Sequence, residues 1–116
     1  MKKVVKFGGS SLASAEQFKK VGDIIRADES RQYVVPSAPG KRFSGDTKVT
    51  DMLYSCYGAA IKEKNFTDLL CAIQDRYNEI IKGLNLTLSL DQDFEEIREN
   101  FGKRLEEITL PPEENT

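Results

Sequence analysis

The chain has 116 residues, of which 39% are apolar and 31% charged, and its formal net charge is −2 at pH 7. This length suits one domain at most. The absence of histidine excludes Ser-His-Asp and Cys-His catalysis and any histidine-ligated metal site, and without a membrane span or a secretory leader we expect a cytoplasmic protein.

The first elements in the chain form a strand-helix-strand pattern. Residues 2–7 are short and β-branched and end at a glycine pair, which predicts a strand followed by a tight turn. Ser14 with Gln17 makes a capping box for a helix that reaches about residue 28. A second strand is predicted over residues 32–35, before a proline. Such a unit is expected to be parallel and right-handed.

A loop and a long helix follow. Residues 36–48 are rich in Pro, Gly, Ser and charged side chains, which predicts a functional or mobile loop. An apolar stripe at helical spacing then predicts a helix from Val49 to near Lys64. Cys56 lies on this stripe and Cys71 at an apolar position of the next helix. We therefore expect two buried thiols, with no disulfide and no metal pair.

Two more helices are predicted in the second half of the chain. Asn65 and Asp68 cap the first, and Gly83 is expected to end it in the left-handed conformation. Ser89 opens the second, and the prolines at 111–112 end it. The last six residues have the composition of a linker.

The number of strands is small for the fold class that this order indicates. A parallel sheet is normally covered on both faces and has about five strands. Two strands are too few, so we expect the N-terminal part of a larger α/β domain, helix-rich from residue 49 onward.

The first motif with chemical potential is Lys6-Phe7-Gly8-Gly9-Ser10-Ser11, at the end of the first strand. Glycines let backbone N–H groups approach a phosphate closely, and a lysine can neutralise charge on a phosphoryl group in transfer. The motif is neither a Walker A loop nor the GxGxxG fingerprint. An ordinary turn after a strand is the structural alternative.

The second motif is Ser37-Ala38-Pro39-Gly40, after the second strand, with Thr50 in the first turn of the next helix. Ligands collect outside the carboxyl ends of parallel strands, so both motifs should lie at one edge of the sheet. The Ser37 hydroxyl can donate there, and the helix dipole at Thr50 favours a carboxylate. The alternative role for Thr50 is a plain helix cap.

The charge distribution agrees with anion chemistry in the first half. Residues 1–63 carry 11 basic and 7 acidic groups, and residues 64–116 carry 6 and 12. Two solvated faces explain the difference equally well, and Lys41, Arg42 and Lys48 could simply form a solvated loop edge. The basic excess of a nucleic-acid-binding protein is absent, so we expect no nucleic acid as a partner. Because no stretch is apolar enough to span a membrane, we expect no membrane partner either.

Three motifs and their order along the chain resemble the aspartokinases of the amino-acid kinase superfamily. The motifs are Lys-Phe-Gly-Gly-Ser-Ser, Val-Val-Pro-Ser-Ala-Pro-Gly and Thr-Asp-Met-Leu. The resemblance covers the chain and is specific up to about Leu53. It implies that residues 1–116 are the N-terminal segment of a three-layer catalytic domain with a mostly parallel sheet. The implied reaction is ATP-dependent phosphorylation of the L-aspartate side-chain carboxylate to 4-phospho-L-aspartate, the first step of lysine, threonine and methionine biosynthesis. Mg²⁺ would accompany ATP, and the full-length parent would be a homo-oligomer.

The resemblance also implies roles for individual residues. The catalytic, phosphate-binding lysine would be Lys6. The nucleotide phosphates would contact Lys6, Phe7, Gly8, Gly9 and Ser10, the substrate would contact Ser37 and Thr50, and no metal ligand is implied. The family usually has threonine at the position of Ser10 and a shorter link before Thr50, so residues 41–49 look like an insertion.

Other parts of the family pattern have no counterpart before Thr116: the Gly-Glu motif, a later substrate arginine, the adenine site and the regulatory ACT domains. Because positioning supplies most of the catalysis in phosphoryl transfer, we expect the segment alone to be inactive. Two alternatives remain: a different amino-acid kinase, such as a glutamate kinase, and a non-catalytic module in which the acidic helices of residues 66–108 bind a partner.

Overall fold

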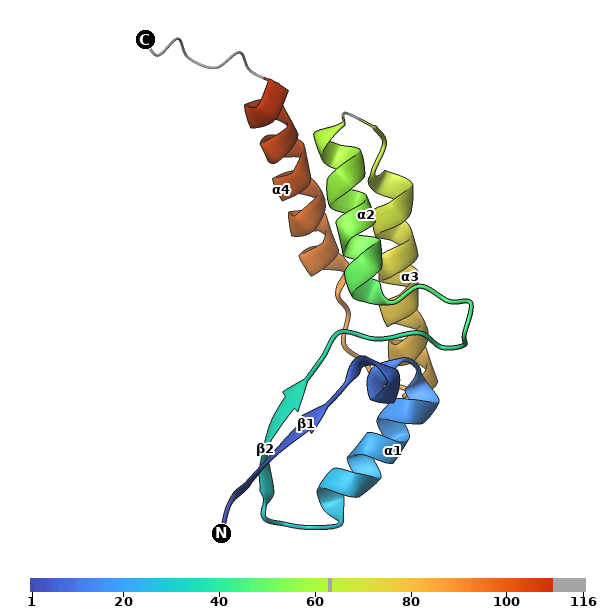
Figure 1. Cartoon of the computed structure of the whole chain (residues 1–116), viewed down its shortest axis with the longest axis vertical. Coiled ribbons are helices and arrows are strands. Elements are labelled where there is room, and N and C mark those ends of the chain that lie inside the picture. Colours follow the sequence, from blue (N-terminus) through green and yellow to red (C-terminus); the bar gives the residue numbers. More distant parts are fainter. Residues whose placement is uncertain (63, 110–116) are drawn as a thin grey trace.

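The computed structural model describes residues 1–62 and 64–109, with side chains described up to Lys103. Two regions lie end to end, a strand-helix-strand unit and a group of three helices (Figure 1). The proline pair and the linker expected at the end of the chain lie outside the described residues.

The strand-helix-strand unit is confirmed. Strand β1 (Lys3–Phe7) is followed by a short 3-10 helix, η1 (Gly9–Leu12), helix α1 (Ala15–Arg26) and strand β2 (Arg31–Pro36). The two strands pair in parallel, with Lys6 opposite Val35. Ser14 caps α1 as expected, because its hydroxyl accepts a hydrogen bond from the Gln17 N–H at 3.3 Å. The short helix η1, which begins at the second glycine, occupies the predicted turn between β1 and α1.

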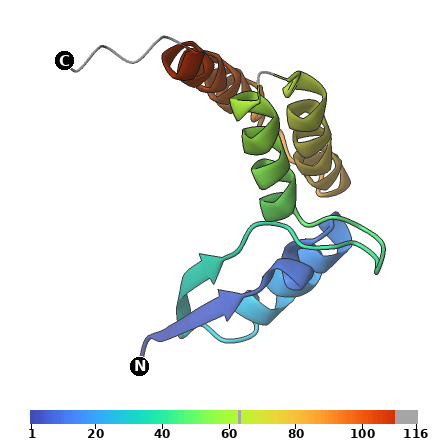
Figure 2. The same cartoon turned by 45° about the horizontal axis from the view of Figure 1, so that its top comes forward.

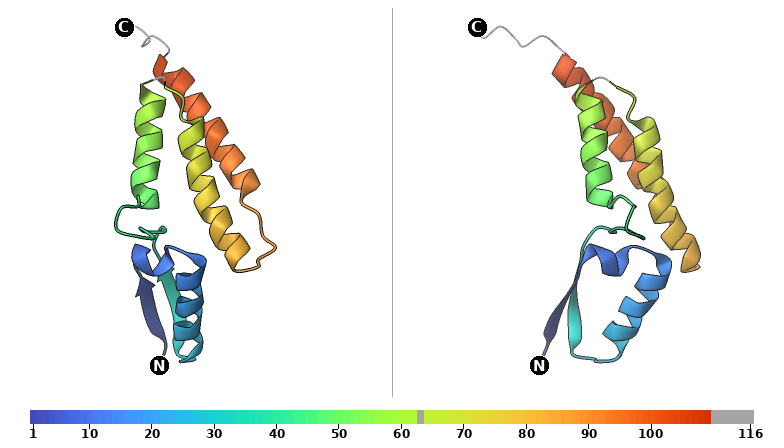
Figure 3. Two further views of the ribbon diagram at one scale, coloured as in Figure 1. Left: turned by 90° about the vertical axis from the view of Figure 1, so that its right-hand side faces the viewer. Right: turned by 45° about the vertical axis from the view of Figure 1, so that its right-hand side comes forward.

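The two-stranded sheet remains largely open to solvent. Helix α1 lies beside it on one side (Figure 3). Val4 is 64% exposed, Tyr33 52% and Val35 45%. Parallel sheets normally bury such β-branched and aromatic side chains on both faces, so the sheet in this chain has an uncovered apolar surface.

The main core lies among the three helices α2 (Val49–Ile61), α3 (Thr67–Gly83) and α4 (Asp91–Thr109) (Figure 2). Its buried members come from all three helices and are Val49, Cys56, Leu70, Ile73 and Phe94. The apolar stripes predicted for these helices therefore face one another in part, because Leu53 and Tyr57 of the α2 stripe and Leu69 of the α3 stripe are exposed. None of the helices in the described part of the chain is both long enough and apolar enough to cross a membrane.

Helix α3 ends differently from the prediction. The left-handed residue is Asn85, with a φ of 55°, and no glycine in the described ranges has a positive φ. Gly83 is instead the last residue of α3, where an added Cβ would lie 2.5 Å from the Cβ of Ala15. The glycine is required because α3 and the start of α1 approach closely at this point.

The two cysteines differ in burial. Both are free thiols, as expected. Cys56 is fully buried, and burial raises its pKa. Cys71 is only partly buried, so the expectation of two buried thiols is correct for Cys56 alone.

Candidate functional site

The two predicted motifs, residues 6–11 and 37–40, lie at the carboxyl ends of β1 and β2, at the same edge of the sheet. Lys6 is the penultimate residue of β1, its side chain is exposed, and it forms no ion pair with the side chains that the structure describes. Ser37 directly follows β2, and its N–H donates to the Phe7 carbonyl at 3.1 Å. The parallel pairing therefore brings the ends of the two motifs together.

The glycines of the two loops are in direct backbone contact. The Gly40 N–H donates to the Gly9 carbonyl at 2.8 Å. A Cβ on Gly40 would lie 2.6 Å from the Gly9 carbonyl carbon and 2.8 Å from the Ser10 nitrogen. A Cβ on Gly9 would lie 3.0 Å from the Ala38 oxygen. Residue 40 therefore needs to be glycine because two backbones meet there, and a Cβ at residue 9 would require its neighbours to shift by a few tenths of an ångström.

Gly8 and Ser10 lie on the accessible side of the first loop. An added Cβ on Gly8 would meet no atom within 4 Å, and Gly8 itself has extended backbone angles. Ser10 is exposed in η1, whose first turn is closed by the Ser11 N–H donating to the Gly8 carbonyl at 3.1 Å. Backbone N–H groups in the first turn of a helix lack partners within that helix, so this segment can offer donors to an anion.

Thr50 is the second residue of α2, and the residue in the cap position is Lys48. The alternative of a plain cap for Thr50 is therefore wrong. The backbone connects this helix start to the second loop, because the Val49 N–H donates to the Pro39 carbonyl at 2.9 Å. The Thr50 side chain lines a hollow of about 330 Å³ with Leu53, Tyr54 and Tyr57 on the exposed face of α2.

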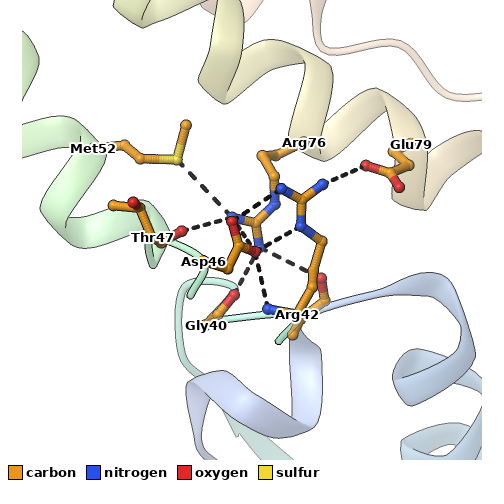
Figure 4. A network of polar contacts seen from close by, with 8 residues as sticks. Gly40, Arg42, Asp46, Thr47, Met52, Arg76 and Glu79 are labelled. Atoms are coloured by element: carbon orange, nitrogen blue, oxygen red, sulfur yellow. Dashed lines mark hydrogen bonds and ion pairs between the residues drawn. The ribbon is translucent and has the colours of Figure 1, made fainter. Parts of the chain in front are cut away.

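Ion pairs connect residues within the segment 41–48 and link this segment to α3. The Arg42 guanidinium donates to Asp46 at 2.6 and 3.0 Å and to Glu79 of α3 at 2.9 Å (Figure 4). The hydrogen bond from the Arg42 side chain is the main reason that the pKa of Asp46 lies well below its usual range. Arg42 remains exposed, as the alternative of a solvated loop edge expects, and the structure adds its ion pairs with Asp46 and Glu79.

Sequence reasoning missed the buried arginine of this region. Arg76 on α3 is only 3% exposed. One terminal nitrogen donates to the Thr47 carbonyl at 2.8 Å, and the other donates to the Gly40 carbonyl at 2.7 Å (Figure 4). Arg76 shares a helix face with Ile73 and Ile80, which are both buried. A charged residue at an apolar stripe position was the signal that could have identified it.

The described residues suit anion recognition better than metal binding. They contain no group of three or more His, Cys, Asp or Glu side chains that could hold a metal ion. At this edge of the sheet the described residues present Lys6, which has no ion-pair partner among them, and the exposed backbone of Gly8. They also present the exposed side chains of Ser10 and Ser37. A lysine, backbone donors and hydroxyls are the groups that bind phosphate and carboxylate.

Known proteins are similar to this chain in sequence. The model of the amino acid kinase family matches residues 1–96. The chain is 43% identical over 112 residues to Aspartokinase 3 of Bacillus subtilis (strain 168), covering 97% of this chain and 24% of that protein. It is 32% identical over 111 residues to Aspartokinase 1, chloroplastic, of Arabidopsis thaliana, covering 92% of this chain and 19% of that protein.

Among solved structures, the aspartate kinase of Clostridium acetobutylicum, described as an allosteric enzyme, matches with a TM-score of 0.83 and 44% identity. The match covers 89% of this chain and 24% of that one. The chain thus spans about a quarter of the length of the Bacillus relative and of the Clostridium structure.

Proposed function

We propose that this chain, which belongs to the amino acid kinase family, supplies the phosphate loop (residues 6–11) and part of the substrate site of an aspartokinase. The reaction transfers the γ-phosphoryl group of ATP to the side-chain carboxylate of L-aspartate, giving ADP and 4-phospho-L-aspartate. The observation that carries the proposal is the contact between the two loops at one sheet edge, through Gly9 and Gly40. Identity to aspartokinases over nearly the whole chain supports the choice of substrate.

On the nucleotide side, we assign the central role to Lys6. Its unpaired ammonium would balance the negative charge that spreads over the phosphoryl oxygens in the transition state. Phe7, Gly8, Gly9 and Ser10 would bring backbone N–H groups and a hydroxyl to the phosphates. The open space beside Gly8 supports this assignment, since a bare backbone is what a close phosphate contact requires.

On the acceptor side, we assign Ser37 and Thr50 to L-aspartate. Ser37 follows β2 at the edge where β1 ends, and the Phe7 carbonyl anchors its backbone. Thr50 lies in the first turn of α2, where the helix dipole favours a carboxylate. The two residues would orient the acceptor while Lys6 holds the donor phosphate.

Mg²⁺ is the usual companion of ATP in phosphoryl transfer, where it neutralises charge on the phosphates. The described residues do not fit a metal site made by this chain, because they contain no cluster of candidate ligands. The ion would be bound through the nucleotide phosphates, as Mg²⁺ commonly is. We therefore assign no step to a metal held by these residues.

The proposal includes a larger catalytic domain, of which residues 1–116 are the N-terminal segment. The exposed apolar side chains of the two-stranded sheet support this, because further strands and helices would cover them. A homo-oligomeric, cytoplasmic parent enzyme belongs to the same proposal and rests on the family resemblance.

The test is aspartate-dependent ADP formation by the full-length protein, comparing Lys6→Ala with Lys20→Ala, an exposed lysine on α1. We expect Lys6→Ala to lower kcat by about 10²-fold or more with a smaller change in the KM for aspartate. Lys6→Arg should recover only part of the activity because the planar guanidinium is larger than the ammonium. Lys20→Ala should behave like the wild type.

Two outcomes would contradict the proposal. Wild-type kcat in Lys6→Ala would show that the lysine is a solvated charge at the strand end. Phosphorylation of L-glutamate in preference to L-aspartate would favour the alternative of a glutamate kinase.

A further inference from the structure

Arg76 contacts backbone carbonyls that lie close in sequence to each of the three segments assigned to the reaction. It donates to the Gly40 carbonyl at 2.7 Å, at the end of the substrate loop (residues 37–40), and to the Thr47 carbonyl at 2.8 Å, three residues before Thr50. The nitrogen that binds Gly40 also reaches the Ala13 carbonyl at 3.5 Å, one residue beyond η1 of the phosphate loop. One side chain from α3 thus joins Ala13 to the loop that contains Gly40 and Thr47. Figure 4 shows its contacts with Gly40 and Thr47.

The charge of Arg76 is balanced inside the protein. Its guanidinium lies 3.6 Å from the Asp46 carboxylate, which is itself only 10% exposed. Arg42 donates to the same carboxylate and also reaches Glu79, one helical turn beyond Arg76 on α3. The two terminal nitrogens of Arg76 bind main-chain carbonyls, whereas Nε is buried without a hydrogen-bond partner among the described residues. A buried guanidinium whose charge is paired inside the protein is a structural group, with no charge left for a substrate.

The shape of the guanidinium explains why arginine stands at this position. It holds two terminal nitrogens apart in one rigid plane, so each can bind a different carbonyl at the same time. A lysine ammonium carries the same charge at a single point on a flexible stem. It can face Asp46 but cannot reproduce two carbonyl contacts in a fixed geometry.

We infer that Arg76 is a positioning residue, which holds the phosphate loop and the substrate loop at the separation that phosphoryl transfer requires. The inference rests on the function proposed above for these loops. In this proposal Arg76 contacts neither substrate, and it acts through the carbonyls of Gly40, Thr47 and Ala13. Because transfer depends on alignment of donor and acceptor, a shift of one loop against the other lowers the rate more than it weakens binding.

The first experiment measures kcat and both KM values in full-length Arg76→Met and Arg76→Lys, at a temperature where circular dichroism shows each variant to be folded. Arg26→Met is the matched control, since Arg26 is a 74% exposed helical arginine paired with Asp23. We expect Arg76→Met to lower kcat by about 10²-fold, with less than a tenfold change in either KM. Arg76→Lys should recover only a small part of this loss, and Arg26→Met should match the wild type.

The second experiment measures hydrogen exchange and does not depend on activity. The amides of Gly40 and Val49 report the loop contacts, because they donate to Gly9 and Pro39. In Arg76→Lys we expect both to exchange at least about tenfold faster than in the wild type, whereas the Phe18 amide of α1 keeps its wild-type rate. If Arg76→Met does not fold, Arg76→Lys decides the question in both experiments.

Three results would overturn the inference. The first is wild-type kcat in folded Arg76→Met, and the second is full recovery by Arg76→Lys, which would show that charge near Asp46 is sufficient. The third is equal acceleration of exchange at Phe18, Gly40 and Val49, which is the mark of a general loss of stability. If the wild type instead lacks aspartate-dependent activity, the proposed function fails, and the exchange data still decide what Arg76 does to the loops.

Discussion

Replacing Gly40 by alanine tests whether the contact between the two loops controls the reaction. The added Cβ would lie 2.6 Å from the Gly9 carbonyl carbon and 2.8 Å from the Ser10 nitrogen, if nothing moved. Ordinary contacts between non-bonded carbon atoms are about 3.5–4.0 Å. The neighbours are backbone atoms with no rotamer to change, so one loop must move by about 1 Å relative to the other.

The expected magnitude has two parts. Overpacking of this kind costs about 1–3 kcal/mol of stability. A misplacement of about 1 Å between reacting groups lowers the rate by about 10²-fold. Gly40→Ala should therefore lower both the melting temperature and kcat of the full-length protein, and the loss of kcat should remain at temperatures where the protein is folded.

Gly58→Ala provides the matched control. Gly58 lies inside α2, and a Cβ there would meet no atom within 4 Å. Alanine at this position should stabilise the helix by about 0.5–1 kcal/mol and leave the kinetics unchanged. The assay is aspartate-dependent ADP formation together with thermal melting followed by circular dichroism. Wild-type kcat and melting temperature in Gly40→Ala would refute the reasoning, because they would show that the loops tolerate separation.

Three further predictions follow from other contacts. Gly83→Ala should destabilise the protein by about 1–3 kcal/mol, because its Cβ would lie 2.5 Å from that of Ala15, and the double variant with Ala15→Gly should recover most of this loss in urea unfolding. Thr50→Val should raise the KM for aspartate roughly 10- to 150-fold through loss of a hydrogen bond to a charged group, with the KM for ATP unchanged; unchanged kinetics would assign Thr50 a structural role only. The pKa of Asp46 is lowered in the folded state, so its stabilising effect is present above the unfolded pKa of about 3.9 and is lost as the pH falls below it. The urea midpoint should accordingly fall more between pH 6 and pH 3 in the wild type than in Asp46→Asn, and equal falls would contradict the role of this carboxylate.

The part of the fold that depends on local signals could be predicted from the sequence. The Ser14 cap bonds an amide three residues away, and the stripes of α2, α3 and α4 repeat within single helices. Their prediction needed no knowledge of distant neighbours. The parallel pairing of β1 and β2 followed from the helix between them, and it placed Lys6 and Ser37 at one edge.

Other features depend on the sequence only through contacts between distant segments. Arg42 belongs to an exposed loop of charged residues, and the composition of this loop does not indicate that its partners are Asp46 and Glu79. Gly83 carries the usual signal of a left-handed helix end, yet the proximity of Ala15 is the reason for glycine there.

The candidate site residues could be placed from local signals, whereas Arg76, which we propose positions them, depends on contacts between distant segments. Lys6, Gly9 and Ser37 lie next to strand ends, so their neighbourhood follows from the order of elements along the chain. Arg76 binds carbonyls 36 and 63 positions earlier in the sequence. Backbone carbonyls carry no residue identity, so no sequence pattern indicates which of them a side chain will meet. Only the packing of α3 against both loops selects Gly40 and Ala13 as its partners.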